Sequence, residues 1–417
     1  MCVLHVIDHA FIHDSECSSC FLFTIPNFHV CFCNGINSSS SNHTHSNITC
    51  FENERDALLK FKQDLKDASN RLSSWVIGED CCKWTGVVCD NFTGHVREIR
   101  LRNPYEFSNE NYTELEAYMR YQLGAKINPS LLDLKHLQYL DLSKNDFEGT
   151  PIPSFIGSIA TLRYLNLSMA GFGGTIPPQL GNITTMRYLD LRSNYDLLSG
   201  NLQWLSHLVL LQHLDMSGVD LSKALDWLQV TSNLPSLVEL HLSTCELKNL
   251  LHGAVSIAIE NLTSLVSLDL SNNQLHGSIP TSLGKLCKLK TISLSHNEFS
   301  GEVADIFVGF SQCKSNELET FRSWGNHLLG HLPYELGQLT SLADFDLHSN
   351  SFSGPIPASI GRLSSLIRLD LSHNEFNGTL PESLGHLGKL EVLYISDNSL
   401  GVSSLMFTLP VSRNYVT

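Results

Sequence analysis

The chain has few basic residues for its 417-residue length. Lysine and arginine number 27 against 42 aspartates and glutamates, which gives a formal net charge of −15 with histidine neutral. Binding to nucleic-acid phosphates needs clustered Lys and Arg, so the composition argues against a nucleic-acid partner. An acidic surface of this kind mainly favours solubility.

Long apolar runs are also missing. No stretch reaches the eighteen or so apolar residues of a transmembrane helix, so the sequence predicts no membrane span in this chain. Residues 20–33 are apolar enough for the core of a signal peptide, but no Lys or Arg precedes Arg55. We expect 1–35 to be an atypical signal-like leader and the Ser/Asn-rich 36–49 to be a polar linker.

Catalytic signatures are absent as well. The sequence contains no Gly-x-Ser-x-Gly elbow, no His-Glu-x-x-His, no phosphate loop and no kinase signature. We therefore expect a protein that is not an enzyme and that needs no cofactor and no metal.

The twelve cysteines are unevenly distributed. Nine precede residue 90, and only Cys245, Cys287 and Cys313 follow, which suits an oxidised end-piece on a cysteine-poor body. Nine Asn-X-Ser/Thr triplets add to the indication of the secretory route. These candidate glycosylation sites are Asn37, Asn42, Asn47, Asn91, Asn111, Asn166, Asn182, Asn261 and Asn377.

One pattern recurs through most of the chain. It reads Leu137-x-x-Leu140-x-Leu142-x-x-Asn145-x-Phe147-x-Gly149, and about twelve copies of roughly 24 residues fill 93–410. Copies occur at Ile99, Leu137, Leu165, Leu189, Leu214, Leu240, Leu265, Leu289, Phe321, Leu342, Leu366 and Leu390. An insertion at about 103–122 and irregular copies at about 217–261 interrupt the spacing. We expect loops or short helices on the convex side there, with Trp204 and Trp227 used for packing.

The spacing within one copy predicts its structure. Leu140 and Leu142 lie two residues apart, so on a strand both point inward while Tyr139 and Asp141 point outward. Stacked copies then form an α/β repeat solenoid, a right-handed superhelix with a parallel β-sheet on its concave face. The buried amide of Asn145 satisfies backbone groups where the chain turns inward, and Cys245 occupies the same slot as a buried thiol.

The segment before the repeats predicts a helix. Ala57, Leu58, Phe61 and Leu65 are spaced as one helical stripe, so we expect a helix over 54–65 that covers the first repeat.

Two sets of residues carry a family resemblance. After the strands come Gly-x-Ile-Pro steps, as in Gly174-Thr-Ile-Pro177 and Gly277-Ser-Ile-Pro280, which resemble the plant class of leucine-rich repeats. Residues 50–92 are similar to the plant N-terminal cap, with Leu72-Ser-Ser-Trp75 and Asp80-Cys-Cys-Lys-Trp-Thr-Gly-Val-Val-Cys89. The irregular middle from Val219 to Gln229 resembles receptor-like proteins of the ethylene-inducing xylanase receptor type.

The resemblance implies a disulfide-bonded cap, with Cys50 paired to Cys81 and Cys82 to Cys89. It also implies a kinase-less ectodomain at the outer face of the plasma membrane, acting in defence or development. Such a protein binds a peptide, protein or oligosaccharide ligand and signals through a leucine-rich-repeat co-receptor kinase. Because 411–417 reads as a truncated tail without a C-terminal cap or membrane span, we also keep two alternatives. These are an apoplastic inhibitor similar to polygalacturonase-inhibiting proteins, and a non-functional gene fragment.

Cys287 and Cys313 form a further candidate disulfide. They lie near equivalent places in consecutive copies, and stacked strands lie ~5 Å apart. That spacing falls within the Cα range of a disulfide, about 4.4–6.8 Å. The alternative is two buried thiols.

Two groups on the concave face are candidate ligand sites. Tyr139, Tyr164, Tyr188 and His213 share one slot in successive copies, forming either a contact strip for sugars or peptides or a column that packs only on itself. Asp344 and His348 share a strand face with Asp346 and could bind a cation or a basic peptide. The alternative is a solvated patch in which Arg368 pairs with Asp344. The recurring Asp slot, as at Asp141 and Asp346, is predicted to be exposed scaffold, and a glycan on Asn166 would obstruct the Tyr strip.

Overall fold

The computed structural model describes residues 21–25, 28–32, 49–107, 112–248 and 259–401, and it divides into two units, 1–47 and 48–417. In the first unit the described residues form an antiparallel pair, β1 (Phe21–Ile25) and β2 (Phe28–Phe32), within the predicted leader 1–35. The rest of that leader, nearly all of the predicted linker 36–49 and the predicted tail 411–417 lie outside the described residues. None of the helices described is long and apolar enough to cross a membrane.

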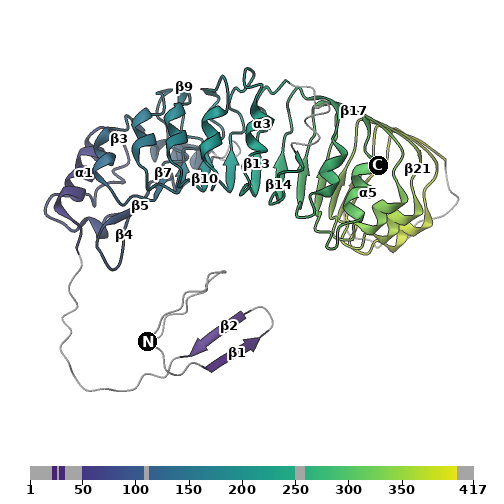
Figure 1. The fold of residues 1–417 in the computed structure, drawn as a ribbon, viewed down its shortest axis with the longest axis horizontal. Coiled ribbons are helices and arrows are strands. Elements are labelled where there is room, and N and C mark those ends of the chain that lie inside the picture. The colour runs from purple at the N-terminus through teal and green to yellow at the C-terminus, as the bar shows by residue number, and fades with distance from the viewer. Residues whose placement is uncertain (1–20, 26–27, 33–48, 108–111, 249–258, 402–417) are drawn as a thin grey trace. The chain divides into compact units, whose positions relative to one another are not determined.

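The second unit is built on one long sheet. Over the described residues, thirteen strands hydrogen-bond in chain order, and all neighbours are parallel except β4 and β5 (Figure 1). The strands are β4 (Val87–Cys89), β5 (Val96–Arg100), β7 (Tyr139–Asp141), β8 (Tyr164–Asn166), β10 (Tyr188–Asp190), β12 (His213–Asp215), β13 (Glu239–His241), β14 (Ser267–Asp269), β16 (Thr291–Ser293), β18 (Thr320–Arg322), β20 (Asp344–Asp346), β22 (Arg368–Asp370) and β24 (Val392–Tyr394). This is the predicted parallel sheet of a leucine-rich-repeat solenoid.

The register places equivalent residues of successive copies side by side. Leu140, Leu165 and Leu189 pair across β7, β8 and β10, and all three are 0% exposed. Because side chains alternate along a strand, each copy buries these leucines against the copies before and after it. The core is therefore continuous along the stack, and stability is collective.

An asparagine at most of the turns holds neighbouring copies together, as the repeat pattern predicts. The Asn194 amide donates to the carbonyls of Leu191 (2.8 Å) and Leu167 (2.9 Å), and its oxygen accepts from the Phe172 amide (2.9 Å). Every polar atom of this buried side chain is thus satisfied by backbone. Cys245 takes the same slot as a buried free thiol that contacts the Met216 carbonyl, 3.1 Å away, and burial raises its pKa to about 12.

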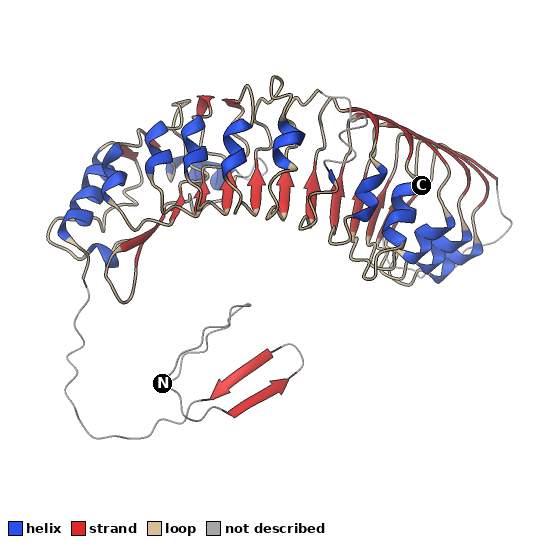
Figure 2. Cartoon of the chain, in the orientation of Figure 1, coloured by secondary structure: helices blue, strands red, loops and turns tan. Residues whose placement is uncertain are grey.

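Short helices form the opposite side of each copy (Figure 2). In the described residues these are the 3₁₀ turns η2 (Pro129–Asp133), η3 (Ser154–Ser158), η4 (Pro178–Asn182), η5 (Gln203–His207), η6 (Thr281–Lys285), η7 (Tyr334–Gln338), η8 (Ala358–Arg362) and η9 (Glu382–His386), with the α-helices α3 (Trp227–Thr231) and α5 (Ala304–Ser311). Helices need more width than strands ~4.8 Å apart, so the stack curves with the strands inside. Consecutive turns nevertheless pack closely, since a Cβ at Gly181 or Gly337 would clash with a carbonyl oxygen of the next turn.

Smaller strands complete the described copies. A six-stranded parallel sheet follows the turns of the later copies: β15 (His276–Ser278), β17 (Glu298–Glu302), β19 (His327–Gly330), β21 (Ser351–Pro355), β23 (Glu375–Thr379) and β25 (Ser399–Gly401). In the earlier copies β9 (Gly173–Thr175) pairs with β11 (Asp196–Leu198). In the irregular region Trp204 and Trp227 are buried, as expected of packing residues, with α3 on the outer side.

The N-terminal cap closes the first end of the core. Helix α1 (Glu52–Gln63) buries Ala57, Leu58 and Phe61, as the helical stripe predicts. The predicted extension to Leu65 is wrong, because that residue belongs to strand β3 (Leu65–Asp67), which pairs antiparallel with β6 (Leu123–Ala125). The cap also contains η1 (Cys81–Lys83), and the insertion carries α2 (Tyr112–Arg120).

Two disulfides close the cap, and one arginine ties it to the repeats. The structure pairs Cys50 with Cys81 and Cys82 with Cys89, each with Cα atoms 5.4 Å apart. The Arg71 guanidinium donates to the carbonyls of Leu101 (2.9 Å) and Tyr121 (2.8 Å) and to the side-chain oxygen of Asn145 (3.0 Å). This one side chain therefore joins the cap to the first repeat, to the insertion and to the turn asparagine Asn145.

Candidate ligand-binding face

Four aromatic side chains form a continuous stack on the strand face. The ring centroids of Tyr139 and Tyr164 lie 3.9 Å apart, those of Tyr164 and Tyr188 4.2 Å, and those of Tyr188 and His213 4.0 Å. The rings are within 12° of parallel because the parallel register gives each strand the same orientation. We call these four residues the aromatic column.

Both ends of the aromatic column are occupied. The Arg100 guanidinium lies 5.3 Å from the Tyr139 ring centroid, a cation–π contact. At the other end His213 Nδ1 lies 2.6 Å from Glu239 Oε2, and the His241 ring meets His213 edge-on at 6.0 Å. The inner rings therefore have both faces covered by neighbours. The Tyr139 and Tyr188 hydroxyls donate to Asp141 Oδ2 (3.4 Å) and Asp190 Oδ2 (3.5 Å) on their own strands.

The hydroxyls of Tyr139 and Tyr188 stay protonated. Burial, helped by the neighbouring Tyr164, raises the pKa of Tyr139 well above its usual value. Burial and the Asp190 charge do the same for the pKa of Tyr188. These two half-buried side chains are therefore neutral hydrogen-bonding groups along the strand face.

The recurring aspartates are buried, which contradicts the prediction that this slot is exposed. Asp141, Asp190, Asp215, Asp346 and Asp370 are at most 6% exposed, although Asp269 is half-buried. Asp141 accepts from the Ser143 amide (3.0 Å) and hydroxyl (2.6 Å), two residues further along the chain. Neighbouring strands cover the carboxylate, and the local bonds satisfy it. These aspartates therefore stabilise the scaffold, as predicted, but they do so as buried side chains and not as exposed ones.

Asn166 replaces aspartate in this slot and behaves in the same way. It is 6% exposed, and its oxygen accepts from the Ser168 amide (2.9 Å) and hydroxyl (2.6 Å). A glycan on its nitrogen has no room in this packing. Among the other candidate glycosylation sites, Asn91, Asn182, Asn261 and Asn377 are exposed, while Asn37, Asn42, Asn47 and Asn111 lie outside the described residues.

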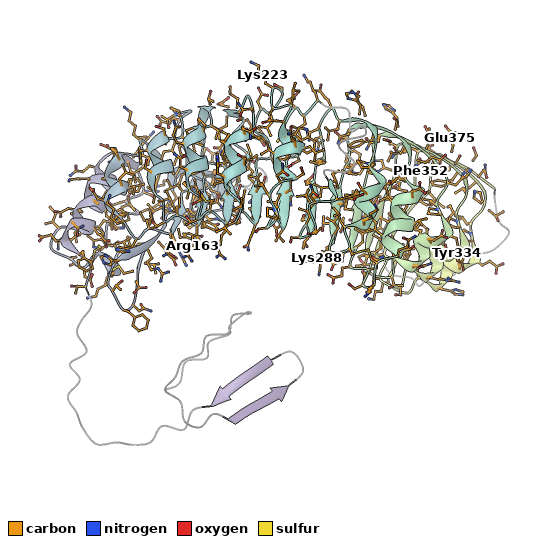
Figure 3. The ribbon with its side chains drawn as sticks, viewed as in Figure 1. Arg163, Lys223, Lys288, Tyr334, Phe352 and Glu375 are labelled. Atoms are coloured by element: carbon orange, nitrogen blue, oxygen red, sulfur yellow. A yellow bond between two sulfur atoms is a disulfide. The ribbon has the colours of Figure 1, made fainter. Side chains whose placement is uncertain are left out.

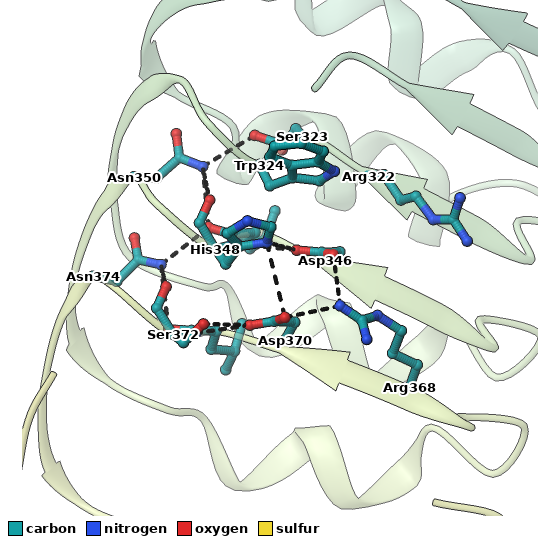
Figure 4. A network of polar contacts seen from close by, with 12 residues as sticks. Arg322, Ser323, Trp324, Asp346, His348, Asn350, Arg368, Asp370, Ser372 and Asn374 are labelled. Atoms are coloured by element: carbon teal, nitrogen blue, oxygen red, sulfur yellow. Dashed lines mark hydrogen bonds and ion pairs between the residues drawn. The ribbon is translucent and has the colours of Figure 1, made fainter. Parts of the chain in front are cut away.

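The second predicted group forms a compact network farther along the sheet (Figure 4). Arg368 Nη2 lies 2.9 Å from Asp370 Oδ2 and 3.2 Å from Asp346 Oδ2, whereas its nearest distance to Asp344 is 3.9 Å. Asp344 instead accepts from Arg322 Nε at 3.0 Å. His348 Nδ1 lies 2.7 Å from Asp346 Oδ1. We call Arg322, Asp344, Asp346, His348, Arg368 and Asp370 the charged cluster.

The structure adds one aromatic residue that the sequence reasoning missed. Trp324 stacks on His348 with centroids 4.7 Å apart and 13° between planes, and it meets His296 edge-on at 4.1 Å. Trp324 and His348 each lie two residues before the turn asparagine of their copy. Comparing that slot between copies could have found the pair.

Two triads have the residue types of a cation site. Asp190, His213 and Asp215 form one, and Asp346, His348 and Asp370 form the other, with ligand atoms within 4.8 Å of one another. Each already contains a cation, since Arg192 lies 3.3 Å from Asp215 and Arg368 lies 2.9 Å from Asp370. A metal ion would have to displace these guanidinium groups.

Cys287 and Cys313 lie near the middle of the stack. They form a disulfide with Cα atoms 5.5 Å apart, at the junction of η6 and α5. The bond ties two consecutive copies on the helical side and does not touch the strand face.

The repeats and the cap match known family descriptions. Residues 51–90 match the leucine-rich-repeat N-terminal domain, and 136–158, 263–306 and 338–400 match leucine-rich repeats. Receptor-like protein EIX1 of Solanum lycopersicum is 42% identical over 228 residues, which cover 54% of this chain and 22% of that protein. The chain is thus a leucine-rich-repeat protein that is similar to plant receptor-like proteins. Receptor-like protein EIX2 from the same plant is 39% identical over 54% of this chain and 21% of its own length, so the chain spans about a fifth of these relatives.

Solved structures agree on the leucine-rich-repeat fold. The crystal structure of PEPR1–AtPEP1 superposes with a TM-score of 0.65 at 29% identity, over 84% of this chain and 49% of that one. The Arabidopsis receptor kinase HAESA, in complex with the peptide hormone IDA and the co-receptor SERK1, superposes with a TM-score of 0.59 at 27% identity. The match covers 84% of this chain and 62% of that one. These neighbours are plant receptor ectodomains.

Proposed function

We propose that this chain is the ligand-recognition part of an extracellular plant receptor, which acts in defence and delegates signalling to a leucine-rich-repeat co-receptor kinase. The aromatic column is the observation that carries the proposal. It runs across four neighbouring strands and combines half-buried aromatic rings with tyrosine hydroxyls, the amphipathic chemistry that protein interfaces favour.

Two further observations support it. The relatives carry the name receptor-like protein, and HAESA, which has the same fold, forms a complex with a peptide hormone and a co-receptor. Most of the recurring aspartates of the strand face are buried and bonded within the scaffold, as Asp141 is to Ser143. Binding, with transmission through a partner, is the function this geometry supports.

The test is ligand-dependent recruitment of a co-receptor. The full chain, secreted from plant cells, is mixed with size-separated fractions of leaf apoplastic fluid, and binding of the SERK1 ectodomain is measured by interferometry. Tyr164→Ala/Tyr188→Ala breaks the column, and Tyr195→Ala removes a 74% exposed tyrosine outside it as the matched control. We expect a fraction that promotes co-receptor binding to wild type and to the control but at least about tenfold less to the double variant. Equal binding by all three proteins would contradict the proposal, and so would the absence of any active fraction.

A further inference from the structure

Two arginines beside the aromatic column have no partner among the described residues. Arg163 and Arg187 each directly precede a column tyrosine, on β8 and β10, and both are exposed. They occupy equivalent positions, since the Arg187 amide donates to the Arg163 carbonyl at 2.8 Å. Within the described residues neither guanidinium makes a hydrogen bond or an ion pair. We call them the arginine pair, and Figure 3 shows Arg163 on the strand side of the stack.

The other arginines of this face are engaged. Arg97 bonds Asp90 at 2.8 Å, Arg192 contacts Asp215 at 3.3 Å, and Arg368 bonds Asp370 at 2.9 Å. Unlike these arginines, Arg163 and Arg187 are exposed and form no ion pair within the described residues. A protein with a net charge of −15 has many carboxylates, so two adjacent free guanidiniums are not explained by the scaffold.

The four chain segments that surround the arginine pair contain no acidic residue. The segments that enter β7, β8, β10 and β12 are 135–139, 160–164, 184–188 and 209–213, and none contains Asp or Glu. Asp190 and Asp215, farther along these strands, already face Arg192 and His241. Glu98 and Glu239 lie one strand beyond the two ends of the column and are paired with Arg100 and His213. The zone around the arginine pair itself is therefore locally positive.

We propose that the arginine pair binds carboxylates of an extended acidic peptide that lies along the aromatic column. This inference rests on the proposed ligand-binding function and names the class of ligand. Stacking of sugar rings is disfavoured, because Tyr164 and Tyr188 have both faces covered by neighbouring rings. Ring edges and hydroxyls suit a peptide backbone and its side chains instead.

Spacing sharpens the expected sequence of the peptide. Adjacent strands place the two arginine stems ~4.8 Å apart, and in an extended peptide alternate side chains on one face lie ~6.6 Å apart. Flexible arginine side chains can close that difference, so acidic residues at alternate positions fit the pair. Two acidic residues in direct succession point to opposite faces and can supply only one carboxylate.

The experiment measures Kd of the full chain for fluorescent peptides by anisotropy. The probes are a peptide alternating Glu and Ser, the same peptide with Gln for Glu, and one with paired Glu residues separated by paired Ser. Oligogalacturonate is tested beside the peptides as an acidic saccharide. The variant is Arg163→Gln/Arg187→Gln. Lys223→Gln/Lys288→Gln is the matched control, since it removes the same charge from two exposed lysines elsewhere on the stack (Figure 3).

We expect the alternating Glu peptide to bind, with Kd about tenfold higher for the arginine variant and about unchanged for the control. The affinity should also fall with added salt. The inference is overturned if the Gln peptide binds equally, if both double variants behave alike, or if only oligogalacturonate binds. Loss of peptide binding with retention of Tyr-dependent co-receptor recruitment would reject the acidic-peptide assignment alone, whereas loss of both would reject the proposed function as well.

Discussion

The aromatic column and the charged cluster occupy the same face of the same sheet, yet they use their polar groups differently. In the charged cluster Arg322 pairs with Asp344, and Arg368 pairs with Asp346 and Asp370, so the charges are satisfied within the protein. Beside the aromatic column, Arg163 and Arg187 remain unpaired in the described residues. The strand face is scaffold where charges meet one another, and we propose that it is a binding surface where they do not.

The largest expected effect is on the charged cluster. Arg368→Gln leaves Asp346 and Asp370 close together without their shared cation, so we expect the free energy of unfolding to fall by about 2–3 kcal/mol. Arg187→Gln removes an unpaired exposed charge and should change the free energy of unfolding by less than about 0.5 kcal/mol. Urea unfolding followed by Trp fluorescence measures both. Equal losses of unfolding free energy for Arg368→Gln and Arg187→Gln would show that both arginines are equally engaged in the scaffold.

The aromatic column should be the next most sensitive. Tyr164→Ala removes two stacked ring contacts and much of a half-buried side chain, at a cost of about 2 kcal/mol in unfolding free energy. Tyr195→Ala, the exposed control, should cost less than about 0.5 kcal/mol. Thermal unfolding monitored by circular dichroism separates the two. If Tyr164→Ala were as mild as the control, the stack would not contribute to stability.

A smaller effect follows from His241 at the end of the column. Burial lowers its pKa, but the hydrogen bond to Asp215 and the charges of Asp215, Asp269 and Glu239 outweigh burial, so the net shift is upward. The folded state then binds the proton more tightly, and this stability is present below the ordinary His pKa of about 6.5 and is lost as pH rises through the folded value. We expect wild type to lose stability relative to His241→Gln as pH rises above about 6.5, measured by urea unfolding at a series of pH values. Parallel pH profiles for the two proteins would contradict this.

The smallest effect concerns glycosylation. Asn166 lies buried under the column region, whereas Asn377 is exposed on β23 beside the charged half. Peptide mapping of the secreted chain should find a glycan on Asn377 and none on Asn166. Enzymatic removal of the glycans should leave the melting temperature about unchanged, because an exposed glycan makes few packing contacts. An occupied Asn166 would mean that the strand face around Tyr164 is more open than the structure shows.

The repeat spacing predicted most of the fold because its information is local and periodic. Two leucines two residues apart and an asparagine three residues after the second determine the strand, the buried side and the turn, and copies in register then align Tyr139, Tyr164 and Tyr188. The end of α1 was misplaced at Leu65, because the helical stripe does not reveal that β6, contributed by the insertion, pairs with that segment. Pairing between distant segments is invisible to periodicity.

The candidate site was only partly predictable for a related reason. Outward-pointing aspartates were expected to be exposed, but neighbouring strands ~4.8 Å away and the bond to Ser143 bury Asp141. Trp324 and the arginine pair stand out only when their neighbours are known. One stacks on His348, and the other lacks the acidic partners that Arg368 has.

The most direct measurement maps where an acidic peptide contacts the chain. The alternating Glu and Ser peptide, carrying a photoreactive leucine analogue, is irradiated with the full chain, and cross-linked residues are identified by mass spectrometry. The account predicts cross-links to 138–213, concentrated near Arg163, Arg187 and the column tyrosines. Cross-links concentrated at 320–394, over the charged cluster, would contradict it.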